Sequence, residues 1–358
     1  MPFILDNPNQ IKKIDKSHVY KSIETFPDQI RQVLEEAHLI KVPYEYSKVN
    51  QVVVNGMGGS NLGVGIVKSA WSGEIKTPIT ILSGYEVPAN VDNNTLYVIS
   101  SYSGNTEEPL SVYRELKKRK AKIIAITARG RGRLERLMIK DNIPGYIFKP
   151  EYNPSRSPRL GLGYSIFGTA VLLAKAGLFK IKIGEMKDIV ASLEIWDREF
   201  RLEIPVKYNK AKKLAQELFN RIPLAVGAEF LIGNLRVLRN QFCENGKNFA
   251  GYLTVPDLNH YAMEGLSFPL SNRKNLACLF IDSPFYHPRI KRRMLLTKKV
   301  VKKNGIKCVD YKLSGKTKIT QSFELLQIGT WLSYYLGILN RVNPAANPWV
   351  DWFKKELG

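Results

Sequence analysis

Cysteine and histidine are scarce in this sequence of 358 residues. Its three cysteines, Cys243, Cys278 and Cys308, form no CxxC pair, and its four histidines form no HExxH motif. This scarcity argues against a disulfide-stapled scaffold and a thiolate metal site, and it is typical of proteins from a reducing cytoplasm. Metal-dependent catalysis lacks obvious ligands as well.

Long apolar runs are also missing. No segment approaches the length of a membrane span, and the first residues, MPFILDNPNQIKKIDK, contain no signal-peptide hydrophobic region. We therefore expect a cytoplasmic protein without a membrane partner. Hydrophobic residues make up 44% of the chain, which predicts a globular protein large enough for two domains.

Acidic residues are outnumbered by basic ones. The 54 Lys and Arg against 32 Asp and Glu give a formal net charge of +22. Such a charge attracts nucleic acid or steers small phosphorylated molecules. The densest basic clusters, at 117–122, 129–136 and 290–303, have no interleaved aromatic pattern, and no zinc-finger spacing occurs. Nucleic-acid binding is therefore the minor interpretation, and we expect most basic residues on solvated faces.

Strand-like and helix-like segments alternate through residues 1–150. An arm at 1–45 carries one helical pattern, with a break or a new start at Pro27. Short apolar runs follow, mostly separated by helical patterns: QVVVNGM, TPITILSG, TLYVISS, AKIIAIT and GYIFKP. This alternation predicts an α/β domain with a mostly parallel sheet flanked by helices.

A stretch rich in Pro, Gly and Ser, EYNPSRSPRLGLG at 151–163, is the expected domain linker. The same kinds of segment return over 164–341, with strand-like runs at IPLAVGAEF, LACLFID and IKCVDYKL. Residues 342–358 form a C-terminal tail. We therefore expect a second α/β domain of the same architecture as the first.

The loop GMGGSNLGVG at 56–65 follows the first strand but lacks the residues that define nucleotide-binding loops. A dinucleotide fingerprint needs glycine at position 61, where Asn61 stands. A phosphate-binding Walker loop needs Lys and Ser or Thr after Gly63, where Val64 and Gly65 stand. Two interpretations remain: a glycine turn that allows close approach between the backbone and a bound group, or a tight turn without a further role.

Three serines, a threonine and a glycine crowd into SSYSGNT at 100–106, between a strand and a helix. One helix cap needs fewer hydroxyls, so we interpret this loop as an anion cradle at a helix N-terminus. Two loops at the carboxyl ends of neighbouring parallel strands lie side by side, which makes a phosphate the expected ligand of both. The candidate phosphate-binding residues are Gly58, Gly59, Ser60, Ser101, Ser103 and Thr106.

With SGYEVP between them, these two loops resemble the sugar isomerase (SIS) fold, which binds phosphosugars. The chain is most similar to the bifunctional phosphoglucose/phosphomannose isomerases, and the likeness continues through SPRLGLGYSIFG, QFCENGKNFAGYLTVPDLNH and FKKEL. The resemblance implies two SIS-type domains and a cytoplasmic isomerase of hexose 6-phosphates. It also implies catalysis without a metal or an organic cofactor, in a homodimer whose active site is shared.

The resemblance further implies a general base and a ring-opening histidine. The base is Glu244 in CENGK, although on spacing alone a glutamate before Asn-Gly is a solvated loop residue. The histidine is His260 in DLNHY, contributed across the dimer. The family usually continues with Asn-Glu after this histidine, whereas Tyr261 and Ala262 stand here.

Two cations complete the set of residues carried over from the family. The ring-opening lysine near the C-terminus maps to Lys354 in FKKEL, with Lys355 as the alternative. Without the resemblance, these lysines would be explained as the basic end of a helix, which the helix dipole favours. The arginine that stabilises the enediolate maps to Arg159 in SPRLG, with Arg156 as the fallback. The alternatives in function are a phosphosugar-sensing binding protein and another SIS enzyme, such as an aminosugar-forming isomerase.

Overall fold

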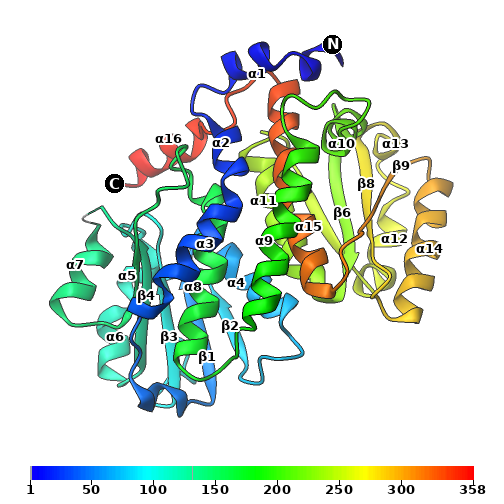
Figure 1. Cartoon of the computed structure of the whole chain (residues 1–358). Helices are drawn as coiled ribbons and strands as arrows, with labels where there is room; N and C mark the ends of the chain where they lie inside the picture. The colour runs from blue at the N-terminus through cyan, green and yellow to red at the C-terminus, as the bar shows by residue number, and fades with distance from the viewer. Residues whose placement is uncertain (1, 131) are drawn as a thin grey trace.

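Two parallel sheets, with helices between and around them, make up the protein (Figure 1). The computed structural model describes residues 2–130 and 132–358. Because every strand pairing in both sheets is parallel, the prediction of two α/β domains with mostly parallel sheets is confirmed. Among the described residues, no helix combines the length and the apolar composition that crossing a bilayer requires.

The first sheet has five strands in the order β2-β1-β3-β4-β5. Helices cover both of its faces, so its middle strand β3 is buried along its whole length. Gly56 at the end of β1 is in register with Ser100 at the end of β3, which confirms that the two polar loops leave neighbouring strands at the same level. The strands are β1 (Gln51–Gly56), β2 (Ile79–Leu82), β3 (Thr95–Ser100), β4 (Lys122–Ala128) and β5 (Gly145–Phe148).

The helices of this half follow the sequence pattern with one interruption. The helix expected after the serine-rich loop is divided at Val112 into two short helices. The helix that follows the 151–163 segment packs on strands β4 and β5 of the first sheet. The helices are α4 (Gly59–Ala70), α5 (Glu107–Ser111), α6 (Tyr113–Lys118), α7 (Arg133–Lys140) and α8 (Leu162–Lys175).

The second sheet has four strands in the order β7-β6-β8-β9. Its edge strand β7 was not anticipated from the sequence, because GYLTV is half-exposed along most of its length and lacks the continuous apolar pattern of the buried strands. The strands are β6 (Ile222–Ala228), β7 (Gly251–Val255), β8 (Leu276–Asp282) and β9 (Lys307–Lys312). The helices are α9 (Ile183–Phe200), α10 (Lys210–Leu218), α11 (Ile232–Glu244), α12 (Ala262–Gly265), α13 (Asn272–Asn275), α14 (Pro288–Lys303) and α15 (Lys318–Leu339).

A layer of helices joins the two halves (Figure 1). Helix α15 is buried nearly all round, which explains why its sequence is apolar without an amphipathic pattern. Helices α4 and α11 cross so closely that a Cβ on Gly233 would lie 2.2 Å from the carbonyl oxygen of Gly65. Glycine at this crossing therefore allows the helix that follows the first glycine loop to pack against the helix that ends in Glu244.

The described part of the N-terminal arm contains three α-helices besides short 3₁₀ helices, so the expectation of one helix is wrong. Asp15 is the C-cap of the first helix, and its carboxylate accepts hydrogen bonds from the backbone N–H groups of Val19 and Tyr20 in the first turn of the second. Pro27 lies at the start of the third, where proline is tolerated, so the predicted new start is confirmed. These helices are α1 (Pro8–Ile14), α2 (Val19–Glu24) and α3 (Phe26–Glu36).

Candidate active site

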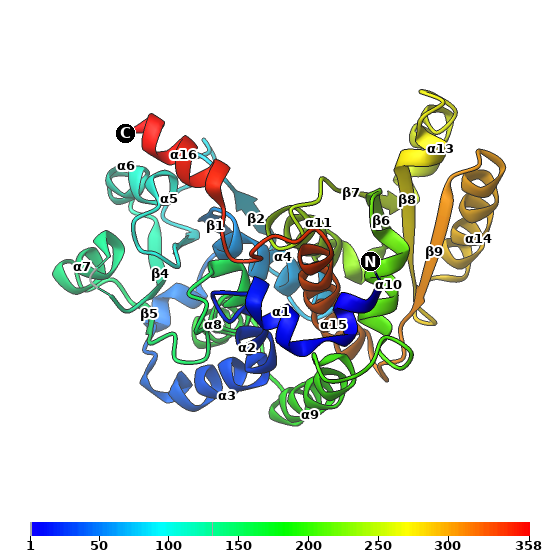
Figure 2. The ribbon, with the colours of Figure 1, turned by 90° about the horizontal axis from the view of Figure 1, so that it is seen from above.

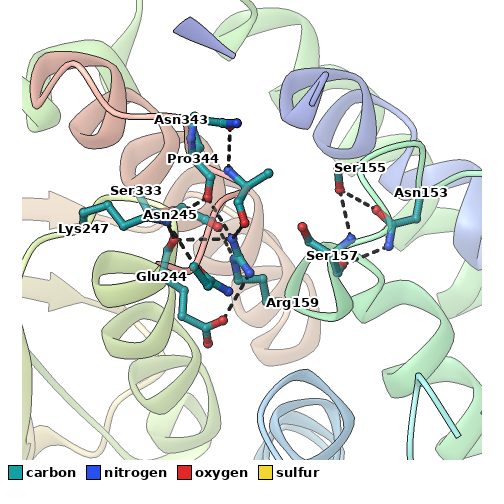
Figure 3. Close-up of polar contacts among 12 residues, drawn as sticks. Asn153, Ser155, Ser157, Arg159, Glu244, Asn245, Lys247, Ser333, Asn343 and Pro344 are labelled. Atoms are coloured by element: carbon teal, nitrogen blue, oxygen red, sulfur yellow. Dashed lines mark hydrogen bonds and ion pairs between the residues drawn. The ribbon is translucent and has the colours of Figure 1, made fainter. Parts of the chain in front are cut away.

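A buried arginine and a partly exposed glutamate form the centre of the candidate site (Figure 3). Glu244 is the last residue of α11, and Arg159 lies in a short 3₁₀ helix, Pro158–Leu160, within the predicted linker. The Arg159 Nη1 atom lies 3.2 Å from Oε2 of Glu244. The arginine side chain is 3% exposed and the glutamate side chain 30% exposed, so the carboxylate is the member of the pair that solvent can reach.

Arg159 is fixed from several sides. Its Nε donates to Oδ1 of Asn245 at 2.6 Å, and its Nη2 donates to the carbonyl oxygens of Pro344 at 2.8 Å and Ala345 at 2.9 Å (Figure 3). Burial lowers the pKa of the guanidinium, and the Glu244 carboxylate opposes that shift. Because a guanidinium keeps its proton under all ordinary conditions, Arg159 is a permanent positive charge held beside Glu244.

Arg156, the alternative candidate for the arginine, does not lie in this cluster. Arg156 is exposed, with a left-handed backbone conformation (φ 56°), and no hydrogen bond or ion pair of its side chain is recorded in the described structure. The structure therefore brings Arg159, and not Arg156, to Glu244.

The first glycine loop packs directly against the arginine segment. Gly58 is the exposed N-cap of α4, and the buried Gly59 begins the helix. A Cβ on Gly59 would lie 2.6 Å from the carbonyl of Pro158 and 2.8 Å from the backbone nitrogen of Arg159. Glycine at this position is therefore what allows the start of α4 to touch the segment that carries the arginine.

The hydroxyl groups of the two polar loops have different partners. The Ser60 hydroxyl, buried, accepts from the backbone N–H of Tyr102 at 2.7 Å and so ties the first loop to the second. The buried Ser101 hydroxyl donates to Oγ1 of Thr106 at 2.8 Å. Ser103 is exposed, and its hydroxyl accepts from the Asn105 N–H at 3.3 Å. In the second loop, Ser103 therefore faces solvent, and the hydroxyl of Thr106 is fixed by the buried Ser101.

Two of the predicted residues lie apart from the Arg159–Glu244 pair in a single chain. His260 ends the 3₁₀ helix Asp257–His260 after β7 and is exposed; in the described structure no contact joins it to Glu244 or Arg159. Lys354 lies on the last helix, α16 (Pro348–Leu357), whose residues are all exposed. This helix extends above the first domain (Figures 1 and 2), and its Asp351 acts electrostatically on Arg159.

Lys247 belongs to the same cluster, although its sequence position was not predicted to be part of the site. Its ammonium donates to the carbonyl of Glu244 and, at 3.1 Å, to the carbonyl of Pro344 (Figure 3). Burial and the nearby charge of Arg159 lower the pKa of Lys247 to about 8, and Glu244 opposes the shift. The signal was present in the CENGK motif, where a lysine follows Glu244 by three positions.

Asn245 was also missed. It is fully buried, and its amide donates to the Ser333 hydroxyl at 3.1 Å while its oxygen accepts from Arg159. It thus links α15 to the arginine. Among residues 2–130 and 132–358, no group of three or more His, Cys, Asp and Glu side chains is arranged to hold a metal ion.

Two family models match the chain. Residues 45–140 match the SIS domain, and residues 207–357 match the bacterial phospho-glucose isomerase C-terminal SIS domain. Solved structures agree on the fold: a hypothetical protein from Thermus thermophilus superposes with a TM-score of 0.75 at 17% identity, over 99% of this chain and 94% of that one. A glucose-6-phosphate isomerase like protein from the same organism gives a TM-score of 0.61 at 16% identity, over 96% and 98% of the two chains. The molecule is thus a double-SIS protein.

Proteins of similar sequence show which family of double-SIS proteins this chain belongs to. A bifunctional phosphoglucose/phosphomannose isomerase of Caldicellulosiruptor bescii is 30% identical over 343 residues, which cover 95% of this chain and 98% of the relative. A protein of the same description from Aquifex aeolicus is 27% identical over 95% and 98% of the two chains. The chain belongs to the bifunctional phosphoglucose/phosphomannose isomerase family.

Proposed function

We propose that this protein is an aldose–ketose isomerase that interconverts glucose 6-phosphate and mannose 6-phosphate with fructose 6-phosphate. The single observation that carries the proposal is the pairing of a reachable carboxylate, Glu244, with a buried and permanently charged guanidinium, Arg159. Isomerisation of this kind needs a base that moves a proton between C2 and C1 and a cation that stabilises the enediolate formed on the way. The family membership supports the same reaction.

In the proposed mechanism, Glu244 accepts the proton from C2 of the open-chain aldose. The electron pair left at C2 forms the cis-enediolate, whose negative charge Arg159 stabilises at its fixed position. Glu244 then returns the proton to C1 while the proton of the C2 hydroxyl passes to O1. The oxygen on C1 becomes a hydroxyl, the oxygen on C2 becomes the carbonyl, and the ketose results. Since the residues that hold Arg159 are already in place, its contribution requires no reorganisation during the reaction.

The phosphate is proposed to bind the two polar loops. Ser103 offers an exposed hydroxyl, and the exposed Gly58 leaves backbone at the start of α4 open to close approach. Ser60 ties the first loop to the second by accepting from the N–H of Tyr102. Ser101 donates to Oγ1 of Thr106, which leaves the O–H proton of Thr106 to donate to the phosphate. An anchored phosphate leaves the C1–C2 end of the sugar free to reach the Glu244 carboxylate.

Activity on both aldoses follows from the intermediate. Glucose and mannose 6-phosphates differ only at C2, and this carbon becomes planar in the enediolate. One base therefore serves both substrates if the intermediate turns about C2–C3 while its phosphate stays bound. The test is a coupled assay of the purified protein with each hexose 6-phosphate, with and without a chelator. Turnover of glucose 6-phosphate alone would exclude the dual specificity, and turnover of neither would exclude the proposed reaction.

We infer that the active unit is a homodimer in which His260 and Lys354 assist ring opening. His260 is exposed in the single chain, and the exposed apolar side chains of Tyr261, Phe268 and Leu270 lie close to it in sequence. A second copy that covers this region would deliver His260 to a neighbouring site. We also infer a cytoplasmic location, because all three cysteines are free thiols.

A further inference from the structure

Two cations share carbonyl acceptors beside Glu244. Lys247 donates to the carbonyl of Glu244 and to that of Pro344, and Arg159 donates to the same two carbonyls, at 3.4 Å and 2.8 Å. The Pro344 oxygen is therefore held by both positive charges (Figure 3). The Glu244 carbonyl also belongs to the last turn of α11, where the partial negative charge of the helix end favours a cation.

These contacts connect two elements that are distant in sequence. Glu244 ends α11, while Pro344 and Ala345 precede α16, the helix that carries Lys354. Helix α16 has no buried residue of its own, so side-chain packing of the helix does not explain its place above the site. The segment 343–347 that leads into it is consequently what fixes where the helix begins.

We propose that Lys247 is a positioning residue, which clamps the backbone of Glu244 to the start of the C-terminal helix and so sets the geometry between the general base and Lys354. This inference rests on the proposed function in its assignment of Glu244 and Lys354. The backbone part of the clamp, between α11 and 343–347, is independent of that assignment.

The charges around Lys247 make the clamp sensitive to pH. Arg159 faces it with a like charge, the Glu244 carboxylate faces it with an opposite one, and Asp351 on α16 acts on Arg159. Since burial and Arg159 bring the pKa of Lys247 to about 8, the ammonium is charged below that pH and neutral above it. A neutral amine holds two carbonyls less strongly, so the segment should loosen as the pH rises through 8.

The first test needs no substrate. Amide hydrogen exchange of residues 343–357 is measured by mass spectrometry for the wild type, Lys247→Met, Lys247→Arg and a matched control, Lys303→Met, which alters an exposed lysine at the end of α14. Lys247→Met should speed exchange of this segment by about tenfold, whereas the control should not. Unchanged exchange in Lys247→Met would overturn the clamp. The melting temperature of each variant is measured as well. An unchanged melting temperature would show that the faster exchange comes from loosening of this segment and not from destabilisation of the whole fold.

The second test measures turnover of the same variants between pH 6 and 9.5. Lys247→Met should lower kcat by about tenfold to a hundredfold, because small displacements of reacting groups have effects of this size. Lys247→Arg should recover most of kcat and lose the alkaline decline near pH 8. Faster exchange with unchanged kcat would overturn the positioning role. If the wild type itself turns over no hexose 6-phosphate while the exchange result holds, the proposed function fails and the clamp stands.

Discussion

The guanidinium of Arg159 lies 3.2 Å from the carboxylate of Glu244, although 85 positions of sequence separate the two residues. The relationship is asymmetric. Arg159 is held on one side by Asn245 and on the other by the backbone of Pro344 and Ala345, while the Glu244 side chain is partly open to solvent. A fixed charge beside an accessible carboxylate is the arrangement that proton transfer with enediolate stabilisation requires.

Glu244→Gln should abolish isomerisation and leave sugar-phosphate binding nearly unchanged. The amide keeps the shape of the side chain but cannot accept the C2 proton, and loss of a general base lowers kcat by about 10²–10⁴-fold. Turnover is measured with glucose 6-phosphate, and binding of fructose 6-phosphate by calorimetry. Glu199→Gln, which changes an exposed glutamate of α9, is the control. Near-normal turnover of Glu244→Gln would remove this residue from the role of base.

Arg159→Lys should lower kcat/KM by about 10²-fold and also destabilise the fold. A lysine keeps the charge, but it cannot reach Asn245, Glu244 and the two carbonyls at once, so buried acceptors lose their partners. Arg156→Lys is the matched control, because it makes the same change at an exposed arginine of the same segment. If the two variants lose activity equally, the assignment of Arg159 is wrong.

Replacing Ser103 and Thr106 by alanine should weaken binding of fructose 6-phosphate by about a hundredfold or more, because each lost hydrogen bond to a charged group costs about 1.5–3 kcal/mol. The chain should still fold, because Ser103 is exposed and loss of the Thr106 acceptor of the buried Ser101 hydroxyl costs only about 1–3 kcal/mol. Calorimetry measures the affinity, with Ser111→Ala as a control for loss of an exposed hydroxyl in the following helix. Unchanged affinity would mean that SSYSGNT serves only to cap that helix.

The sequence predicts the parallel sheets well because most of their strands contain short apolar runs that are bounded by clear turns. The sequence also predicts where the two polar loops lie, because each loop begins where the apolar run of β1 or β3 ends. The edge strand β7 escapes because half of its surface faces solvent. At the site, Glu244 and Arg159 were named through the family motifs, and their contact depends on the close packing of Gly59 against Pro158, which no local pattern contains. Lys247 was missed because its partners are backbone carbonyls, one of them almost a hundred residues away.

The free energy of unfolding should fall as the pH rises from about 4.5 to 7. Burial raises the pKa of Glu24 to about 7 and that of Asp197 to about 6, so both carboxyls bind protons more tightly in the folded chain than in the unfolded one. Their contribution is complete below the unfolded pKa values and is lost as the pH passes the folded ones. For the partly exposed Glu24 the loss is about 1 kcal/mol after allowance for solvent screening.

Denaturant unfolding at several pH values between 4.5 and 8 measures this dependence. Glu24→Gln should flatten the curve, because the amide carries no titrating proton and still occupies the site. Asp28→Asn, on the adjacent helix α3, is the control and should leave the slope as it is. A stability that rises steadily from pH 4.5 to 7 in the wild type would contradict the prediction.

Two inactive variants should restore activity when they are mixed, if the site is shared between copies. Glu244→Gln removes the base and His260→Ala removes the ring-opening histidine, and in a single chain these residues have no contact in the described structure. A mixed dimer then contains one site with both intact residues and one with neither. Random exchange of subunits should recover about a quarter of the wild-type activity, since half of the dimers are mixed and each has one competent site. The variants are combined under mild denaturant, refolded together and assayed with glucose 6-phosphate, and each variant refolded alone is the control. A mixture no more active than its components, in a sample that sedimentation shows to be dimeric, would assign both residues to a site within one chain.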